Sequence, residues 1–141
     1  ALENFNINKY SKSLDTKDFD ISFAKGLSLE DGCATITKFT ANLIANGINF
    51  VNKIDNISSN KTLVCGGGRN NKFLMDSIEE NLIQNENKLI NLDKYSFKGD
   101  FVESQAFGYL AIRSFLNLPI SFPKTTGCKS PTICGVINKN F

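Results

Sequence analysis

Three consecutive glycines, set between an apolar run and a helical pattern, constrain the fold of this chain more than any other feature. Residues 62–65 form a short apolar run, and Gly66, Gly67 and Gly68 follow it directly. Beyond them, apolar side chains recur at every fourth position, at Leu74, Ile78 and Leu82. The run predicts a short strand that ends at the glycines, and the spacing of four predicts a helix after them.

A second apolar run completes this local pattern. Asn70 or Asn71 can cap the helix, and residues 88–93 then read as another strand. A strand, a helix and a strand at this spacing form a βαβ unit, so the two strands should be parallel with a right-handed crossover. The predicted fold class is α/β, with long helices and a short, mostly parallel sheet.

Two long helices are expected on either side of this unit. Ser28 and the carboxylate of Asp31 fit a capping pattern, so a helix should begin at residue 28 and leave an exit loop at residues 52–61. Its predicted buried face comprises Cys33, Ile36, Phe39, Thr40, Leu43, Ile44, Gly47 and Val51. Residues 100–116 are apolar on nearly all sides and should form a helix sandwiched between other elements. Residues 132–137 look like a closing strand, whereas the first 27 residues are expected to hold little regular structure.

Length and charge restrict the function classes. A chain of 141 residues is expected to form a single domain, residues 1–141. Charged residues make up 21% of it and the formal net charge is +2, so electrostatics give no reason to expect nucleic acid or a membrane surface as a partner. No apolar run approaches 18 residues or so, which predicts neither a transmembrane helix nor a signal peptide. We therefore expect a cytoplasmic protein.

The cysteines and the absence of histidine exclude further chemistry. The four cysteines form no CxxC pair and the chain has no histidine, so a structural zinc site is not expected. Ser-His and Cys-His mechanisms are excluded for the same reason. Cys33 and Cys65 lie in apolar patterns and are predicted to be buried thiols. Only two residues are arginine, against fourteen lysines, which we interpret as a coding bias.

The glycines by themselves leave two readings open. Glycine lets a backbone approach a ligand closely, and a helix start offers unpaired N–H groups to a phosphate, yet glycines also simply turn a chain. The P-loop pattern fails because no Gly-Lys-Ser/Thr follows. The dinucleotide fingerprint fails in part, because Asn71 occupies the position of its third glycine. A Rossmann-like binder of a dinucleotide or S-adenosylmethionine, using Gly66, Gly68 and Asp93, stays an alternative.

Five segments together resemble one known family. They are KSLDTKDFD, GLSLEDGCATITKFTANLI, LVCGGGRNNKFLM, DFVESQAFGYLAIRSFLNLPISFPKTTG and PTICGVI. Their order resembles that in the C-terminal half of anhydro-N-acetylmuramic acid kinases, over roughly residues 12–137. The segment after Lys12 and Ser13 departs from the usual family pattern. The resemblance implies a part of a ribonuclease-H-like lobe of the sugar kinase/actin superfamily, whose two lobes close over ATP.

The resemblance also implies a chemistry and a site. Such enzymes hydrolyse the 1,6-anhydro bond of anhydro-N-acetylmuramic acid and phosphorylate O6 from MgATP, which feeds cell-wall recycling. Contact with the nucleotide is implied for the loop made of Gly66, Gly67, Gly68, Arg69 and Asn70. Arg69 could also be a solvated surface arginine. Contact with the amino sugar is implied for Glu103, although its spacing from Asp100 also suits a helix cap. Thr125, Thr126 and Gly127 match a family loop that we expect to be a structural turn.

The resemblance further implies that essential parts lie elsewhere. Both family phosphate loops and the catalytic aspartate precede the matched region, so no catalytic residue and no metal ligand is expected in this chain, and Mg would be bound mainly through the missing lobe and the phosphates. We expect the chain alone to be inactive, with the missing N-terminal half as a partner. Removing that half should uncover apolar surface, which predicts a homo-oligomer. A non-catalytic oligomerisation module is the remaining alternative.

Overall fold

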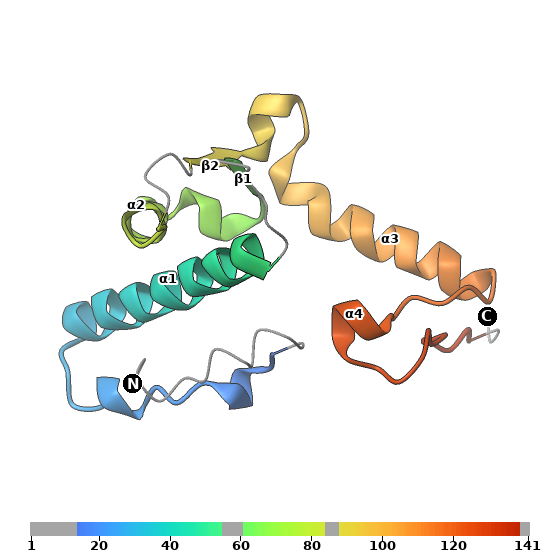
Figure 1. Cartoon of the computed structure of the whole chain (residues 1–141), viewed down its shortest axis with the longest axis horizontal. Coiled ribbons are helices and arrows are strands. Elements are labelled where there is room, and N and C mark those ends of the chain that lie inside the picture. Colours follow the sequence, from blue (N-terminus) through green and yellow to red (C-terminus); the bar gives the residue numbers. More distant parts are fainter. Residues whose placement is uncertain (1–13, 55–60, 84–87, 139–141) are drawn as a thin grey trace.

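The computed structural model describes residues 14–54, 61–83 and 88–138 (Figure 1). Lys12 and Ser13 lie outside the described residues. The helices and strands are α1 Leu29–Ile54, β1 Lys61–Val64, α2 Lys72–Glu80, β2 Lys88–Asn91, α3 Val102–Phe115 and α4 Pro123–Thr126. Before α1, the described part of the chain forms only two short 3-10 turns, in line with the expectation of little regular structure.

The predicted βαβ unit is confirmed. β1 and β2 pair in parallel, with Lys61 opposite Lys88 and Val64 opposite Asn91, and α2 connects them. They are the only strands of the sheet within the described residues. β2 is shorter than expected, because the side chain of Asn91 accepts a hydrogen bond from the N–H of Asp93 (3.0 Å) and the chain turns into a 3-10 helix. Both strands therefore deliver their carboxyl ends to the same edge.

Helix α1 begins as predicted. The Ser28 hydroxyl accepts a hydrogen bond from the N–H of Asp31 (3.0 Å), so it satisfies one of the unpaired donors of the first turn. The helix continues to Ile54, so the expected start of the exit loop at residue 52 was wrong. Phe23 packs on Phe39 with 5.1 Å between ring centroids, which holds the preceding segment against α1.

The core lies between α1 and α2 and differs in part from the predicted face. Ala41 and Ala45 are fully buried and pack with Ile78 and Leu82. Of the predicted α1 face only Phe39 is buried, whereas Ile44 and Val51 are 41% and 44% exposed. Because the side chains at a helix contact set the distance between the axes, two alanines let α2 approach α1 closely. The contact therefore forms on the alanine side of α1.

Three expectations about the surface were wrong. Helix α3 was predicted to be sandwiched, but it contains no buried residue and projects away from the α1–α2–sheet body (Figure 1). Residues 132–137 form no strand; Thr132 makes a single antiparallel bridge to Ser121. Cys33 and Cys65 are exposed. The contacts of α3 are with the segment that follows it, as where the Ser114 hydroxyl donates to the Cys134 carbonyl (2.7 Å).

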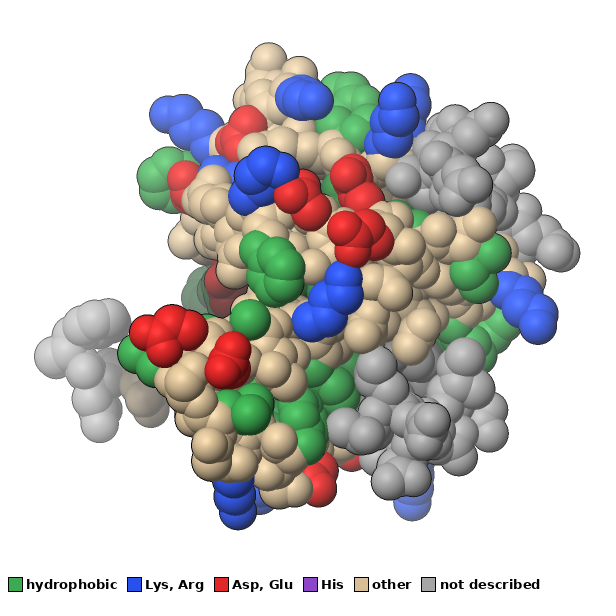
Figure 2. Space-filling view, turned by 90° about the vertical axis from the view of Figure 1, so that its left-hand side faces the viewer, with side chains coloured by type: hydrophobic (Ala, Val, Ile, Leu, Met, Phe, Trp, Pro, Cys, Tyr) green, Lys and Arg blue, Asp and Glu red, His purple; other side chains and the backbone are tan. Residues whose placement is uncertain are grey.

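Charge on the face shown in Figure 2 has no dominant sign. Figure 2 shows lysine, arginine and acidic side chains interspersed on the face that it presents, with hydrophobic side chains exposed between them. No helix within the described ranges is both long and apolar enough to cross a membrane.

Candidate functional site

The glycine loop leads from the carboxyl end of β1 to the start of α2. Gly66 adopts a φ of 81°, and a 3-10 turn, Gly67–Asn70, follows it. Asn71 then caps α2 by accepting a hydrogen bond from the N–H of Leu74 (3.0 Å). Of the two predicted caps, Asn71 is therefore the one used.

The three glycines differ in what the chain itself requires of them. Gly66 needs its positive φ with an extended ψ (81° and 169°), a backbone conformation that a side chain strongly disfavours. Gly67 has an ordinary φ, and a Cβ placed there would meet no atom within 4 Å. A Cβ at Gly68 would make an ordinary contact of 3.7 Å with Leu74. Only Gly66 thus serves the turn; at Gly67 and Gly68 the chain has room for a side chain.

Arg69 is the centre of an ion-pair cluster beneath this loop. Its Nε donates to Asp93 Oδ2 (2.9 Å), and its Nη1 donates to Asp100 Oδ1 (2.6 Å) and to the Gly66 carbonyl (2.9 Å). Its side chain is only 7% exposed. The reading of Arg69 as a solvated surface residue was therefore wrong.

The residues before α3 complete the cluster. The N–H of Gly66 donates to the Gly99 carbonyl (3.1 Å), and the N–H of Gly99 donates to Asp93 Oδ1 (2.8 Å). A Cβ at Gly99 would lie 2.9 Å from Arg69 Nε, which is closer than side-chain carbons come. The glycine loop, the end of β2 and the start of α3 are thus joined through one guanidinium.

The charges of this cluster stabilise one another. The pKa of Asp93 lies below its usual value because the N–H of Gly99 and then the Arg69 guanidinium bind its carboxylate. The pKa of Asp100 is lowered by its hydrogen bond with Arg69, and the pKa of Arg69 is raised by Asp100 and Asp93. All three groups are therefore charged at neutral pH.

Asp93 has a partner that neither reading of the sequence assigned. Both of its carboxylate oxygens accept hydrogen bonds from within the chain. This geometry gives no support to a ribose contact, which the dinucleotide alternative requires. Within the described residues, no group of three or more His, Cys, Asp or Glu side chains is arranged to hold a metal ion.

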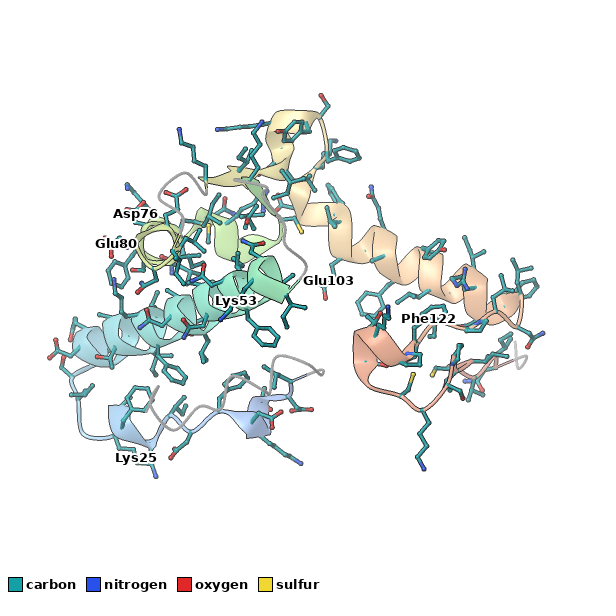
Figure 3. All side chains as sticks on the ribbon, viewed as in Figure 1. Lys25, Lys53, Asp76, Glu80, Glu103 and Phe122 are labelled. Carbon is teal, nitrogen blue, oxygen red and sulfur yellow. The ribbon has the colours of Figure 1, made fainter. Side chains whose placement is uncertain are left out.

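Glu103 lies in the first turn of α3, four residues after Gly99, and is exposed (Figure 3). No side chain caps α3, and Asp100 binds Arg69 instead, so the capping interpretation of Asp100 and Glu103 was wrong. Asn70 is also exposed. Thr125 and Thr126 end α4, and Gly127 caps it with a φ of 74°, as expected for a structural turn.

Sequence reasoning missed the bracing role of Gly99 and Asp100. One signal was available in the composition: the chain has only two arginines, against fourteen lysines. A planar, five-donor guanidinium can bind several acceptors that a lysine cannot reach together. Arg113, the other arginine, also bridges a loop: its Nε donates to the Pro119 carbonyl (2.8 Å).

The comparisons with known proteins agree on one family. Residues 2–140 match the family described as anhydro-N-acetylmuramic acid kinase. An anhydro-N-acetylmuramic acid kinase of Pelagibacter ubique is 50% identical over 145 aligned positions, which cover 100% of this chain and 38% of the relative. Kinases of the same name from Zymomonas mobilis and Rhizobium rhizogenes are each 39% identical, over 90% and 86% of this chain and 33% and 31% of theirs. The chain thus spans about a third of the length of the curated relatives it matches. It belongs to the anhydro-N-acetylmuramic acid kinase family.

Proposed function

We propose that this chain is the C-terminal, nucleotide-binding part of an ATP-dependent sugar kinase. The whole enzyme would hydrolyse the 1,6-anhydro bond of anhydro-N-acetylmuramic acid and phosphorylate O6, in cytoplasmic cell-wall recycling. Family membership supports the reaction class. The lobe would be ribonuclease-H-like, as in the sugar kinase/actin superfamily, and the parallel β1–α2–β2 unit agrees with that assignment.

The observation that carries the nucleotide site is the open space at Gly67. The chain's own backbone and packing do not require glycine there, so the residue is free to let a ligand approach the backbone. The loop also lies at the carboxyl end of a parallel strand and before a helix, where phosphates are commonly bound. We assign the adenosine and inner-phosphate site to the loop of Gly66, Gly67, Gly68, Arg69 and Asn70, whose backbone would make the contacts.

Glu103 is the proposed sugar contact. It is exposed at the start of α3, and Gly99, four residues before it, is bonded to the glycine loop. A sugar on Glu103 and a nucleotide on Gly67 would therefore be held by neighbouring segments.

The chain alone is expected to be inactive. Both carboxylate oxygens of Asp93 and one of Asp100 are already bound within the chain, and the family resemblance implies that the catalytic aspartate and both phosphate loops lie outside it. Loss of general-base catalysis alone costs about 10²–10⁴-fold in rate, and phosphoryl transfer also depends on charge around the phosphates. ADP formation from MgATP and anhydro-N-acetylmuramic acid should stay at background, and turnover by the chain alone would contradict the assignment.

An NMR titration of the chain with MgATP tests the nucleotide site, with S-adenosylmethionine and NAD as controls. We expect shifts at residues 66–70 with MgATP only. A response to a control compound instead would favour the Rossmann-like alternative, and silence with all three would favour an oligomerisation module or a site completed by the missing half. A sequence similar to FDTGPGN directly upstream in the same gene would support the C-terminal assignment.

A further inference from the structure

The Arg69 guanidinium joins three segments that are distant in sequence. It binds the Gly66 carbonyl in its own loop, Asp93 after β2 and Asp100 before α3. The two carboxylates lie 24 and 31 residues along the chain from it. A backbone hydrogen bond from Gly66 to Gly99 runs beside these contacts. The first residue of the glycine loop is therefore held by both its N–H and its carbonyl.

The same geometry leaves Arg69 poorly suited to bind a phosphate. Nε and Nη1 already donate to two carboxylates and a carbonyl, and 93% of the side-chain surface is covered. The two carboxylates also neutralise its charge locally, so an incoming phosphate would meet a net negative cluster. Nη2 is the one guanidinium nitrogen that neither carboxylate binds, and it belongs to a side chain that is only 7% exposed.

We propose that Arg69 is a positioning residue of the nucleotide loop: it holds Gly66 and the 3-10 turn after it against the start of α3, and it does not contact a phosphate. The inference rests on the proposed nucleotide site only for its functional consequence. Loss of Arg69 leaves the phosphate-facing groups unchanged but lets the loop leave its binding conformation.

Hydrogen exchange in the chain tests the positioning directly. Arg69→Ala should accelerate exchange of the Gly66 N–H by about fivefold to tenfold, the worth of one ordinary hydrogen bond, and leave the buried amide of Ile78 unchanged. Arg69→Lys should give little rescue, because an ammonium cannot span the three acceptors. Lys38→Ala is the matched control, because it removes the Lys38–Glu80 ion pair (2.7 Å) between α1 and α2. Unchanged exchange at Gly66 in Arg69→Ala would overturn the proposal.

Gly99→Ala tests the same contact from the other side. Its Cβ would meet Arg69 Nε at 2.9 Å, so the guanidinium must shift and exchange at Gly66 should rise as in Arg69→Ala. Gly108→Ala is the matched control, because a Cβ there meets no atom within 4 Å. Equal effects of the two alanines would contradict the role of Arg69.

Nucleotide affinity separates positioning from phosphate contact. If Arg69 positions the loop, Arg69→Ala should weaken the binding of adenosine and of ATP by the same factor. If Arg69 contacts a phosphate, the substitution should weaken the binding of ATP alone. Asp100→Asn gives results of opposite sign for the two roles. It should weaken the binding of both compounds if Arg69 positions the loop. It should strengthen the binding of ATP if Arg69 contacts a phosphate and its ion pair with Asp100 competes with that contact. If the unaltered chain binds neither compound, the chain alone does not form the proposed nucleotide site, and the exchange measurements still decide the role of Arg69.

Discussion

At the scale of single residues, the glycine triplet divides into one structural and two permissive positions. Gly66 carries a positive φ of 81°, whereas Gly67 and Gly68 do not. Both arginines of the chain act as planar bridges, Arg69 under the glycine loop and Arg113 between α3 and the carbonyl of Pro119. Within one short loop, Gly66 and Arg69 therefore hold the backbone in place, whereas Gly67 and Gly68 leave room for a ligand.

Alanine substitutions should separate these two kinds of glycine. Gly66→Ala should lower the free energy of unfolding by about 1–3 kcal/mol, because Gly66 combines a φ of 81° with an extended ψ of 169°, a region essentially restricted to glycine. Gly67→Ala should leave it unchanged or raise it by about 0.4–1 kcal/mol, because alanine reduces the entropy of the unfolded chain. Urea unfolding of the two variants measures the difference. Equal destabilisation by both would contradict the division.

The Arg69 cluster should make stability depend on acid pH. Asp93 and Asp100 have lowered pKa values in the folded chain, so their contribution is fully present above the ordinary carboxylate pKa of about 3.9 and is lost as the pH falls through their folded values. Thermal unfolding between pH 7 and pH 2 should show a steeper loss below pH 4 or so for the unaltered chain than for Asp93→Asn. Identical acid slopes would show that the carboxylate is not stabilised in the folded state.

At the scale of elements, α1 and α2 hold most of the described buried side chains. Ala41 and Ala45 of α1 meet Ile78 and Leu82, and polar contacts secure both ends of α2. Near its start, Asn71 caps the helix; at its end, the Asn49 side chain of α1 donates to the Asn81 carbonyl (3.1 Å) and accepts from the N–H of Ile83 (3.2 Å). The orientation of α2, and with it the glycine loop, depends on these contacts.

The cap of α2 can be measured independently of the core. Asn71→Ala should lower the free energy of unfolding by about 1 kcal/mol, because it leaves the N–H of Leu74 without its acceptor. Asn70→Ala, at the neighbouring exposed position, is the control and should have a smaller effect. Denaturant unfolding of the three proteins gives the comparison, and the assignment fails if Asn70→Ala costs as much as Asn71→Ala.

At the scale of the whole molecule, the chain exposes apolar surface that a second layer normally covers. On α3, Phe107, Ile112 and Phe115 are 64%, 60% and 69% exposed. Large apolar side chains exposed along one helix are typical of a surface that packs on another chain or domain. The relatives are more than twice as long as this chain.

We expect the isolated chain to self-associate through this uncovered surface. Light scattering should give a mass above that of the monomer, and this mass should rise with concentration. The reason is that exposed apolar side chains and unpaired strand edges associate with other chains. Phe115→Ser should reduce the association. Ile83→Ser, which changes an 80% exposed side chain at the end of α2, is the control. A monodisperse monomer at all concentrations would contradict the expectation.

The sequence by itself determined the local structure. The cap at Ser28, a cap at Asn70 or Asn71, the parallel βαβ unit and the end of its first strand at the glycine triplet all depend on residues a few positions apart or on hydrophobic periodicity, and these signals can be read from the sequence. Only the tertiary structure decided which face of α1 is buried, how Arg69 is used and that α3 lies open. These outcomes depend on contacts between distant residues, such as Arg69 with Asp100, and on whether a covering layer is present, and a local pattern encodes neither.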